Sequence, residues 1–227
     1  MQNADQTTTQ DLGAVTELLS GAFFQPFGRS TTHQLWSSAM VITPAMRGLF
    51  GVDVDALSRT ITLQPHLPAD WDNATLQRLH VGDSVSSLTY QRQDQSLVAK
   101  VTTNSGPQVR LKTSASNART SADGLSIAFP LPPVEVSVPH GLPLPGARTA
   151  QMKVLAETAS SRSLALELEA EAGSVVELKL RRNAPNLNLH AEGASITPAP
   201  HRGDPDALTV NFPSGSGYQH QTVIVRW

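Results

Sequence analysis

The chain has 227 residues, a formal net charge of −2 at pH 7 and no cysteine. This length allows one or two domains with a buried core. The charge provides no basic surface for nucleic acid, the lack of cysteine excludes disulfides and Cys-based catalytic or zinc sites, and no apolar run is long enough to span a bilayer.

A short helix is predicted near the N-terminus, after a polar stretch rich in Thr and Gln. Leu12, Val15, Leu18 and Leu19 have the spacing of one helical face. Gly21 is suited to end this helix, because glycine readily adopts the left-handed conformation found just beyond helix ends. Residues 22–32 are expected to form a loop.

A second helix is predicted to begin near Thr31, because Thr31 and Gln34 fit a capping box. An apolar stripe follows, made of Leu35, Ala39, Ile42, Met46 and Leu49. Pro44 is expected to kink this helix or to start a further one. Neighbouring positions are also apolar, so the helical segment needs a cover, which either the rest of the chain or a partner must provide.

The chain from about residue 60 onward has the pattern of β-strands and turns. Strands are expected at residues 60–64, 74–81, 85–92, 96–103, 107–113, 124–129, 133–138, 150–158, 162–170, 174–182, 186–190, 207–212 and 221–227. In the strands at 162–170 and 174–182, leucine or valine alternates with charged residues, which is typical of antiparallel strands with one buried face. The sequence therefore predicts a mainly β fold: an antiparallel two-sheet β-sandwich preceded by a short helical segment.

Two domains are expected. Residues 1–57 form the helical segment and residues 58–227 the β-sandwich, with a link between them at residues 51–59. The Pro-rich stretch at 130–145 is expected to cross over between the two sheets.

The familiar catalytic and cofactor-binding motifs are absent. The sequence has no G-x-S-x-G elbow, P-loop, H-E-x-x-H or dinucleotide fingerprint, so no cofactor is expected. The seven histidines lack the spacing of metal ligands, so no metal is expected either. Arg181 and Arg182 are interpreted as a solvated strand end, and Trp71 and Trp227 as packing residues rather than sugar platforms.

One region nevertheless resembles a known enzyme family. It comprises Glu17-Leu-Leu-Ser-Gly21, His33-Gln-Leu-Trp-Ser-Ser-Ala-Met40, Arg47-Gly-Leu-Phe-Gly51 and Ile61-Thr-Leu-Gln-Pro-His-Leu-Pro-Ala-Asp-Trp71. These runs are similar to the C-terminal end of bacterial six-hairpin α/α-toroid glycoside hydrolases, of the glycogen-debranching, mannosylglycerate-hydrolase and glucosidase-I-like groups. The last run resembles the start of the β-sandwich that follows the toroid in those enzymes.

The resemblance implies roles for four residues. Glu17 matches the general base of an inverting mechanism, while Trp36, Gln34 and His33 match positions near the sugar pocket. Inverting glycosidases hold two carboxyl groups roughly 6.5–9.5 Å apart, one as general acid and one as general base. In these families the acid lies far upstream of the base, and ahead of Glu17 this chain has only two aspartates in a polar tail. The isolated chain is therefore expected to be inactive.

Two functions compete at this point. In the first, the chain is the C-terminal part of a glycoside hydrolase that acts on α-glycosidic bonds by inversion. Its partners are then an oligo- or polysaccharide in the intact parent, and either the upstream toroid or a second copy bound through the helical segment. In the second, it is a non-catalytic carbohydrate-binding or structural β-sandwich module that packs on a catalytic domain. By composition alone, Glu17 is an ordinary exposed glutamate on a short helix.

Overall fold

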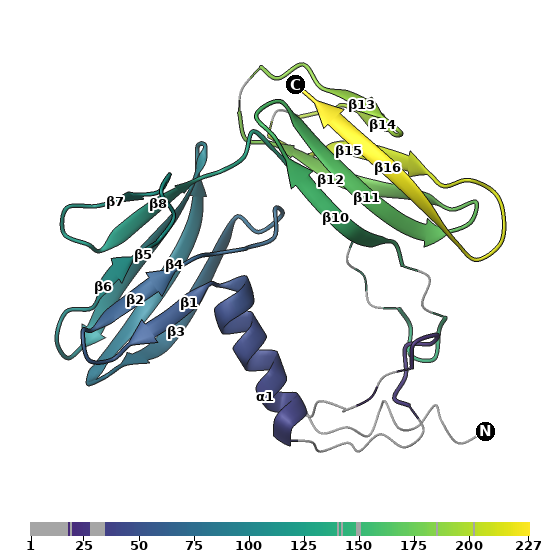
Figure 1. Ribbon diagram of the computed structural model, residues 1–227. Helices are drawn as coiled ribbons and strands as arrows, with labels where there is room; N and C mark the ends of the chain where they lie inside the picture. The colour runs from purple at the N-terminus through teal and green to yellow at the C-terminus, as the bar shows by residue number, and fades with distance from the viewer. Residues whose placement is uncertain are drawn as a thin grey trace. The chain divides into compact units, whose positions relative to one another are not determined.

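The computed structural model describes residues 18, 20–27, 35–139, 141, 143–148, 151–184, 186–201 and 203–227, and for Ser38 the backbone only. In this part of the chain the fold is mainly β, with a short helical segment ahead of antiparallel sheets, as the sequence predicted (Figure 1). The strands form two compact units. The first β-unit is made of residues 42–135 and 181–185, and the second of residues 136–180 and 186–227 together with the chain up to residue 41.

The helical segment consists of the α-helix α1 (Leu35–Thr43) and the π-helix η1 (Pro44–Leu49). The change of helix type falls at Pro44, since proline has no N–H to donate and its ring disturbs the preceding turn. The η1 helix ends where the Phe50 N–H donates to the Ala45 carbonyl at 2.9 Å. The predicted interruption at Pro44 is thus confirmed. The expected start at Thr31 and the first predicted helix, except for Leu18, lie outside the described residues.

Two sheets make up the first β-unit. One sheet has the order β1-β2-β6, with β1 (Val52–Asp55) antiparallel and β6 (Arg110–Lys112) parallel to β2 (Thr60–Leu63). The other has the order β3-β4-β5-β8-β7 and is antiparallel: β3 (Asn73–Val81), β4 (Ser84–Gln93), β5 (Ser96–Ser105), β8 (Ser126–Pro130) and β7 (Arg119–Thr120).

The core of this unit collects buried residues from the strands of both sheets. Its largest fully buried side chains are Tyr90, Ile61, Leu63, Leu88, Ile127 and Val81. Met46 and Phe50 pack against this core, and the Tyr90 hydroxyl donates to the Phe50 carbonyl at 2.6 Å. The end of the helical segment is therefore held by the first β-unit through both apolar contacts and a buried hydrogen bond.

The step from η1 into β1 depends on Gly51. Its φ is +63°, and an added Cβ would lie 1.8 Å from the Gln64 carbonyl oxygen, so only glycine fits. The chain then enters β1 at Val52, where residues 51–59 had been expected to form a link. That expectation is wrong for residues 52–55, because the short Val-Asp-Val-Asp run pairs with β2 instead of spanning between domains.

The second β-unit also contains two sheets. One has the order β10-β11-β16-β13, formed by β10 (Lys153–Ala159), β11 (Ser163–Glu171), β16 (Tyr218–Arg226) and β13 (His190–Glu192). The other has the order β14-β15-β12-β9, formed by β14 (Ser195–Thr197), β15 (Asp206–Asn211), β12 (Val175–Arg182) and β9 (Val134–Ser137).

The alternation predicted for β11 and β12 is confirmed. In β11 the leucines at 164, 166 and 168 are fully buried, while Glu167 and Glu169 lie on the other face. The prediction of a strand at 186–190 is wrong except for His190, because Asn186 has a φ of +59° and the chain turns there. The strands β7 and β14 are too short to leave an alternating pattern, and the sequence did not predict them.

The sequence predicted a division between residues 57 and 58, with the toroid remnant before it and the β-sandwich after it. This division stays a prediction. The compact units follow other limits: η1, β1 and the strands up to β8 belong to one unit, and the chain passes to the other through β9. The Pro-rich stretch at 130–145 contains that strand and connects a sheet of the first unit to a sheet of the second.

Candidate functional site

Three of the four residues that the resemblance singled out, Glu17, Gln34 and His33, lie outside the described residues. The fourth, Trp36, lies in the first turn of α1 and is 57% exposed. The structure thus places one candidate pocket residue on an accessible helix face, and leaves its arrangement relative to the candidate base as a prediction.

The chain directly after Glu17 forms a tight turn. The Ser20 hydroxyl accepts the N–H groups of Ala22 and Phe23 at 3.3 and 3.2 Å, and the Ser20 N–H donates to the Gln25 carbonyl at 2.9 Å. Serine favours such turns because its hydroxyl replaces a backbone acceptor. Gly21 lies in a bend, and its φ is outside the left-handed region. It therefore does not form the left-handed helix end that the sequence suggested.

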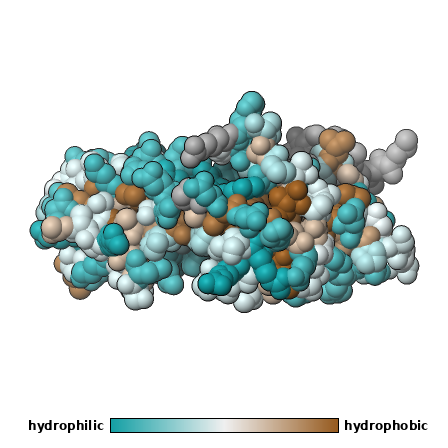
Figure 2. Space-filling model, turned by 90° about the horizontal axis from the view of Figure 1, so that it is seen from above, coloured by the Kyte–Doolittle hydropathy of each residue, from teal (hydrophilic) through white to brown (hydrophobic). Residues whose placement is uncertain are grey.

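Helix α1 exposes an apolar surface. Leu35 is 89%, Met40 68% and Ile42 66% exposed, and Trp36 and Val41 are more than half exposed. Elsewhere, single exposed apolar residues such as Leu57 are ordinary surface features, and Figure 2 shows small apolar groups separated by polar ones on the face in view. The five exposed large apolar side chains of α1 are different, since they are concentrated on one short helical element.

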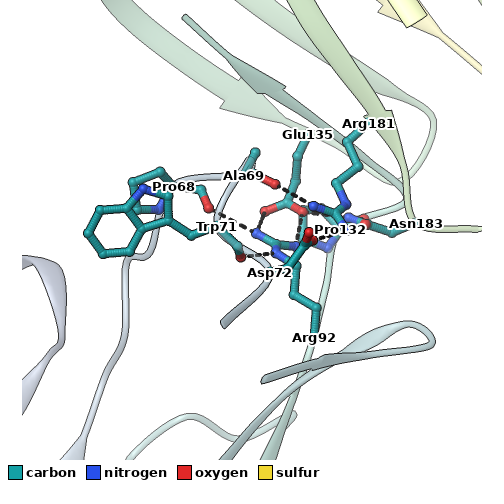
Figure 3. A network of polar contacts seen from close by, with 9 residues as sticks. All are labelled: Pro68, Ala69, Trp71, Asp72, Arg92, Pro132, Glu135, Arg181 and Asn183. Atoms are coloured by element: carbon teal, nitrogen blue, oxygen red, sulfur yellow. Dashed lines mark hydrogen bonds and ion pairs between the residues drawn. The ribbon is translucent and has the colours of Figure 1, made fainter. Parts of the chain in front are cut away.

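A polar network joins residues of the first β-unit, which includes Glu135 and residues 181–185 (Figure 3). The Arg92 guanidinium binds the Glu135 carboxylate with both terminal nitrogens, at 2.6 and 3.2 Å, and its Nε donates to the Trp71 carbonyl at 3.0 Å. The side chains of Arg92 and Glu135 are only 5% and 16% exposed. Glu135 also accepts a hydrogen bond from Asn183 Nδ2 at 2.6 Å.

A second arginine extends this network. Arg181 donates to the Ala69 carbonyl at 2.9 Å and to Asp72 Oδ1 at 2.6 Å. Interpreting Arg181 as part of a solvated strand end is therefore wrong, because its side chain is only 30% exposed and is paired. The sequence could not reveal this pair, whose members are 109 residues apart.

The chemistry of the network is structural. Both oxygens of Glu135 accept hydrogen bonds from buried donors, so this carboxylate is held and not presented to a substrate. Trp71 contributes its carbonyl, and its ring lies 6.2 Å from that of Phe50 at a tilt of 52°. This packing agrees with the structural interpretation of Trp71.

A charged group lies on the outer face of the sheet formed by β10, β11 and β16. Lys153 Nζ is 2.8 Å from Glu169 Oε1 and 4.4 Å from the centre of the Tyr218 ring, while His220 Nε2 is 3.4 Å from Glu169 Oε2. Their mutual hydrogen bond lowers the pKa of Glu169 and raises the pKa of Lys153. Both groups are therefore charged at neutral pH, and they neutralise each other on an accessible surface.

Among the described residues, no group of three or more His, Asp or Glu side chains is arranged to hold a metal ion. No helix in that part of the chain is long and apolar enough to cross a membrane. Comparisons of the chain with protein-family models, with curated proteins and with solved structures found no match.

Proposed function

We propose that this chain is the C-terminal part of a glycoside hydrolase that acts on α-glycosidic bonds by inversion, and that it is inactive as an isolated chain. The observation that carries the proposal is the order of three motifs. The Glu-x-x-x-Gly run at 17–21 precedes the Gln-x-Trp-Ser-x-Ala run at 34–39, and the run at 61–71 follows, beginning in β2 of the first β-unit.

The exposed surface of α1 supports this proposal. A helix in a toroid packs against neighbouring helices, so its apolar arc is wide. In this chain Leu35, Trp36 and Met40 stay more than half exposed, which leaves an apolar face of the kind that further helices would cover. Burying one such side chain contributes about 1.5–3 kcal/mol, so covering this face would contribute several kcal/mol.

The proposed roles follow from the chemistry of inversion. Glu17 would remove a proton from the attacking water, and a carboxylic acid supplied by the upstream toroid would protonate the leaving oxygen. Trp36 would offer an apolar ring face to the sugar, and Gln34 and His33 would offer hydrogen bonds to its hydroxyl groups. A base without its acid and without an aligned substrate gives no measurable turnover.

The test uses this chain alone and the same chain extended by an upstream toroid domain. The isolated chain should not hydrolyse maltose-like, glucosylglycerate-like or mannosylglycerate-like substrates. The extended enzyme should, with inversion at the anomeric carbon. In that enzyme Glu17→Gln should abolish nearly all turnover with little change in KM, whereas the control Glu177→Gln, at an exposed position of β12, should change neither constant. Activity of the isolated chain, or full activity of Glu17→Gln, would refute the proposal.

The second candidate function is a non-catalytic carbohydrate-binding or structural module. It is favoured by one observation: two β-sandwich units make up most of the described residues. Titration of the isolated chain with maltooligosaccharides and glycogen separates the glycosidase fragment from a carbohydrate-binding module, because only the carbohydrate-binding module should bind these sugars without the toroid.

The proposed partner of the helical segment is the upstream toroid, or a second copy of the chain when the toroid is absent. Sedimentation of the isolated chain should then show concentration-dependent association. Met40→Lys, on the exposed face of α1, should reduce it, while Leu57→Lys, on the β1–β2 turn, should not. A monomer at all concentrations would leave the toroid as the partner of this face.

A further inference from the structure

A turn in the second β-unit lies at the end of the Pro-rich stretch. The Ala147 N–H donates to the Leu144 carbonyl at 2.9 Å, Pro145 occupies the second position, and Gly146 occupies the third with a φ of +76°. These are the features of a type II turn, in which proline presets the second residue and glycine allows the third. We call residues 143–148 the Pro-Gly turn.

The Pro-Gly turn pairs with the chain that directly follows Glu17. The Phe24 N–H donates to the Ala147 carbonyl and the Gly146 N–H donates to the Phe24 carbonyl, both at 2.8 Å. An isolated antiparallel bridge also joins Phe23 to Arg148. Segments about 120 residues apart in sequence are therefore linked by backbone hydrogen bonds, and they run side by side in Figure 1.

Each of the two paired segments makes a further contact beyond the pairing. Towards the sheet, Arg148 Nη1 lies 3.0 Å from Glu171 Oε1 at the end of β11. Towards the candidate base, the Phe27 N–H donates at 2.9 Å to the carbonyl of Leu18, the residue after Glu17. A continuous series of contacts thus runs from β11, through the Pro-Gly turn, to the neighbour of Glu17 in the chain.

We propose that the Pro-Gly turn is a positioning element for the catalytic loop, so that the second β-unit takes part in the reaction by holding the segment that carries Glu17. This inference rests on the proposed function. A general base must hold its water against the anomeric carbon, and a displacement of about 1 Å in such a group can cost about a hundredfold in rate. The described part of that segment, residues 20–27, contains no helix or strand that would hold this position without such an attachment.

The contact itself can be tested in the chain as it stands. Directly opposed residues of antiparallel strands have Cα atoms about 4.5–5.5 Å apart, which suits a disulfide. The chain has no cysteine, so Phe23→Cys with Arg148→Cys introduces a single pair, which should oxidise readily. The control pairs Phe23→Cys with Thr158→Cys. Thr158 lies opposite Ala165, six residues along β11 from Glu171 and so about 20 Å away, and this pair should stay reduced.

The positioning role is tested in the enzyme extended by the toroid. Gly146→Ala and Gly173→Ala are a matched pair, since both glycines have positive φ, of +76° and +73°, and an added Cβ would clash with nothing at either site. Gly146→Ala should lower kcat about tenfold to a hundredfold and leave KM within about twofold, because the base is displaced and the sugar pocket is not. Gly173→Ala, in the turn between β11 and β12, should leave both constants unchanged.

The outcomes separate this inference from the function on which it rests. Equal oxidation of the two cysteine pairs, or equal kcat values for the two alanine variants, would overturn the positioning role while glycosidase activity of the extended enzyme stood. If the extended enzyme hydrolysed no α-glycoside, the proposed function would fail and the positioning role with it, whatever the disulfide showed about the contact.

Discussion

Removing the carboxylate of Glu135 should destabilise the first β-unit far more than removing that of Asp72. The variant Glu135→Ala leaves the Arg92 guanidinium, only 5% exposed, without its charged partner. Breaking a buried pair in this way costs about 3–5 kcal/mol. Since Arg92 keeps the carbonyls of Trp71 and Pro68 as acceptors, we expect the lower end, about 3 kcal/mol.

The control, Asp72→Ala, breaks a pair of similar length in the same network. Asp72 is 68% exposed, so water replaces its contact with Arg181, and the expected cost is about 0–1 kcal/mol. A third variant, Arg92→Met with Glu135→Leu, removes both buried charges and should recover most of the stability that Glu135→Ala loses. The comparison separates the cost of an unpaired charge from the value of the pair itself.

Urea unfolding followed by the fluorescence of Trp71 measures these differences. The chain has three tryptophans, so a Trp36→Phe, Trp227→Phe background lets Trp71 alone report on the first β-unit. A loss of 3 kcal/mol should lower the midpoint by about 1–3 M urea. Equal midpoints for Glu135→Ala and Asp72→Ala would refute the reasoning, because burial would then have no influence on the cost of losing the partner.

Three further predictions concern single positions. Gly51→Ala should abolish cooperative unfolding of the first β-unit in a thermal melt, because its Cβ would lie 1.8 Å from a backbone oxygen just after β2. Tyr90→Phe should cost about 1–2 kcal/mol in urea unfolding, because it leaves the buried Phe50 carbonyl without its donor. The pKa of Glu169 is lowered by Lys153, so the stability from this pair is present above the ordinary carboxyl range and is lost as pH falls through the lowered pKa. Lys153→Met should raise the Glu169 pKa in an NMR titration and remove that acid-side loss.

Local patterns predicted most of the strands. In β4, β5, β11 and β16 a period of two residues, bounded by turn residues, placed each strand within a few positions of where the structure has it. The pattern failed where a strand is short or is defined by its partner. The four residues of β1 were expected to be part of a link. They form a strand because they pair with β2, and a local sequence pattern does not reveal that pairing.

The polar network illustrates what sequence patterns cannot supply. Arg92 and Glu135 are 43 residues apart, and each looks like an ordinary charged residue in a strand. Their burial depends on how β4 and Glu135 are brought together within the first β-unit, which is a property of the tertiary fold. The same applies to the Pro-Gly turn, because its pairing with Phe24 is non-local.

The helical segment connects stability to the candidate site. In the described residues, α1 (nine residues) and η1 (six residues) form one helical segment of 15 residues, and an isolated helix of roughly 12–15 residues is only marginally stable in water. Its C-terminal continuation is anchored, since Met46 and Phe50 pack against the first core, but its N-terminal turn, which carries Leu35 and Trp36, is exposed. A surface that covers this turn would therefore stabilise the helix and fix Trp36 in one step. Under the proposed function that surface would be the toroid.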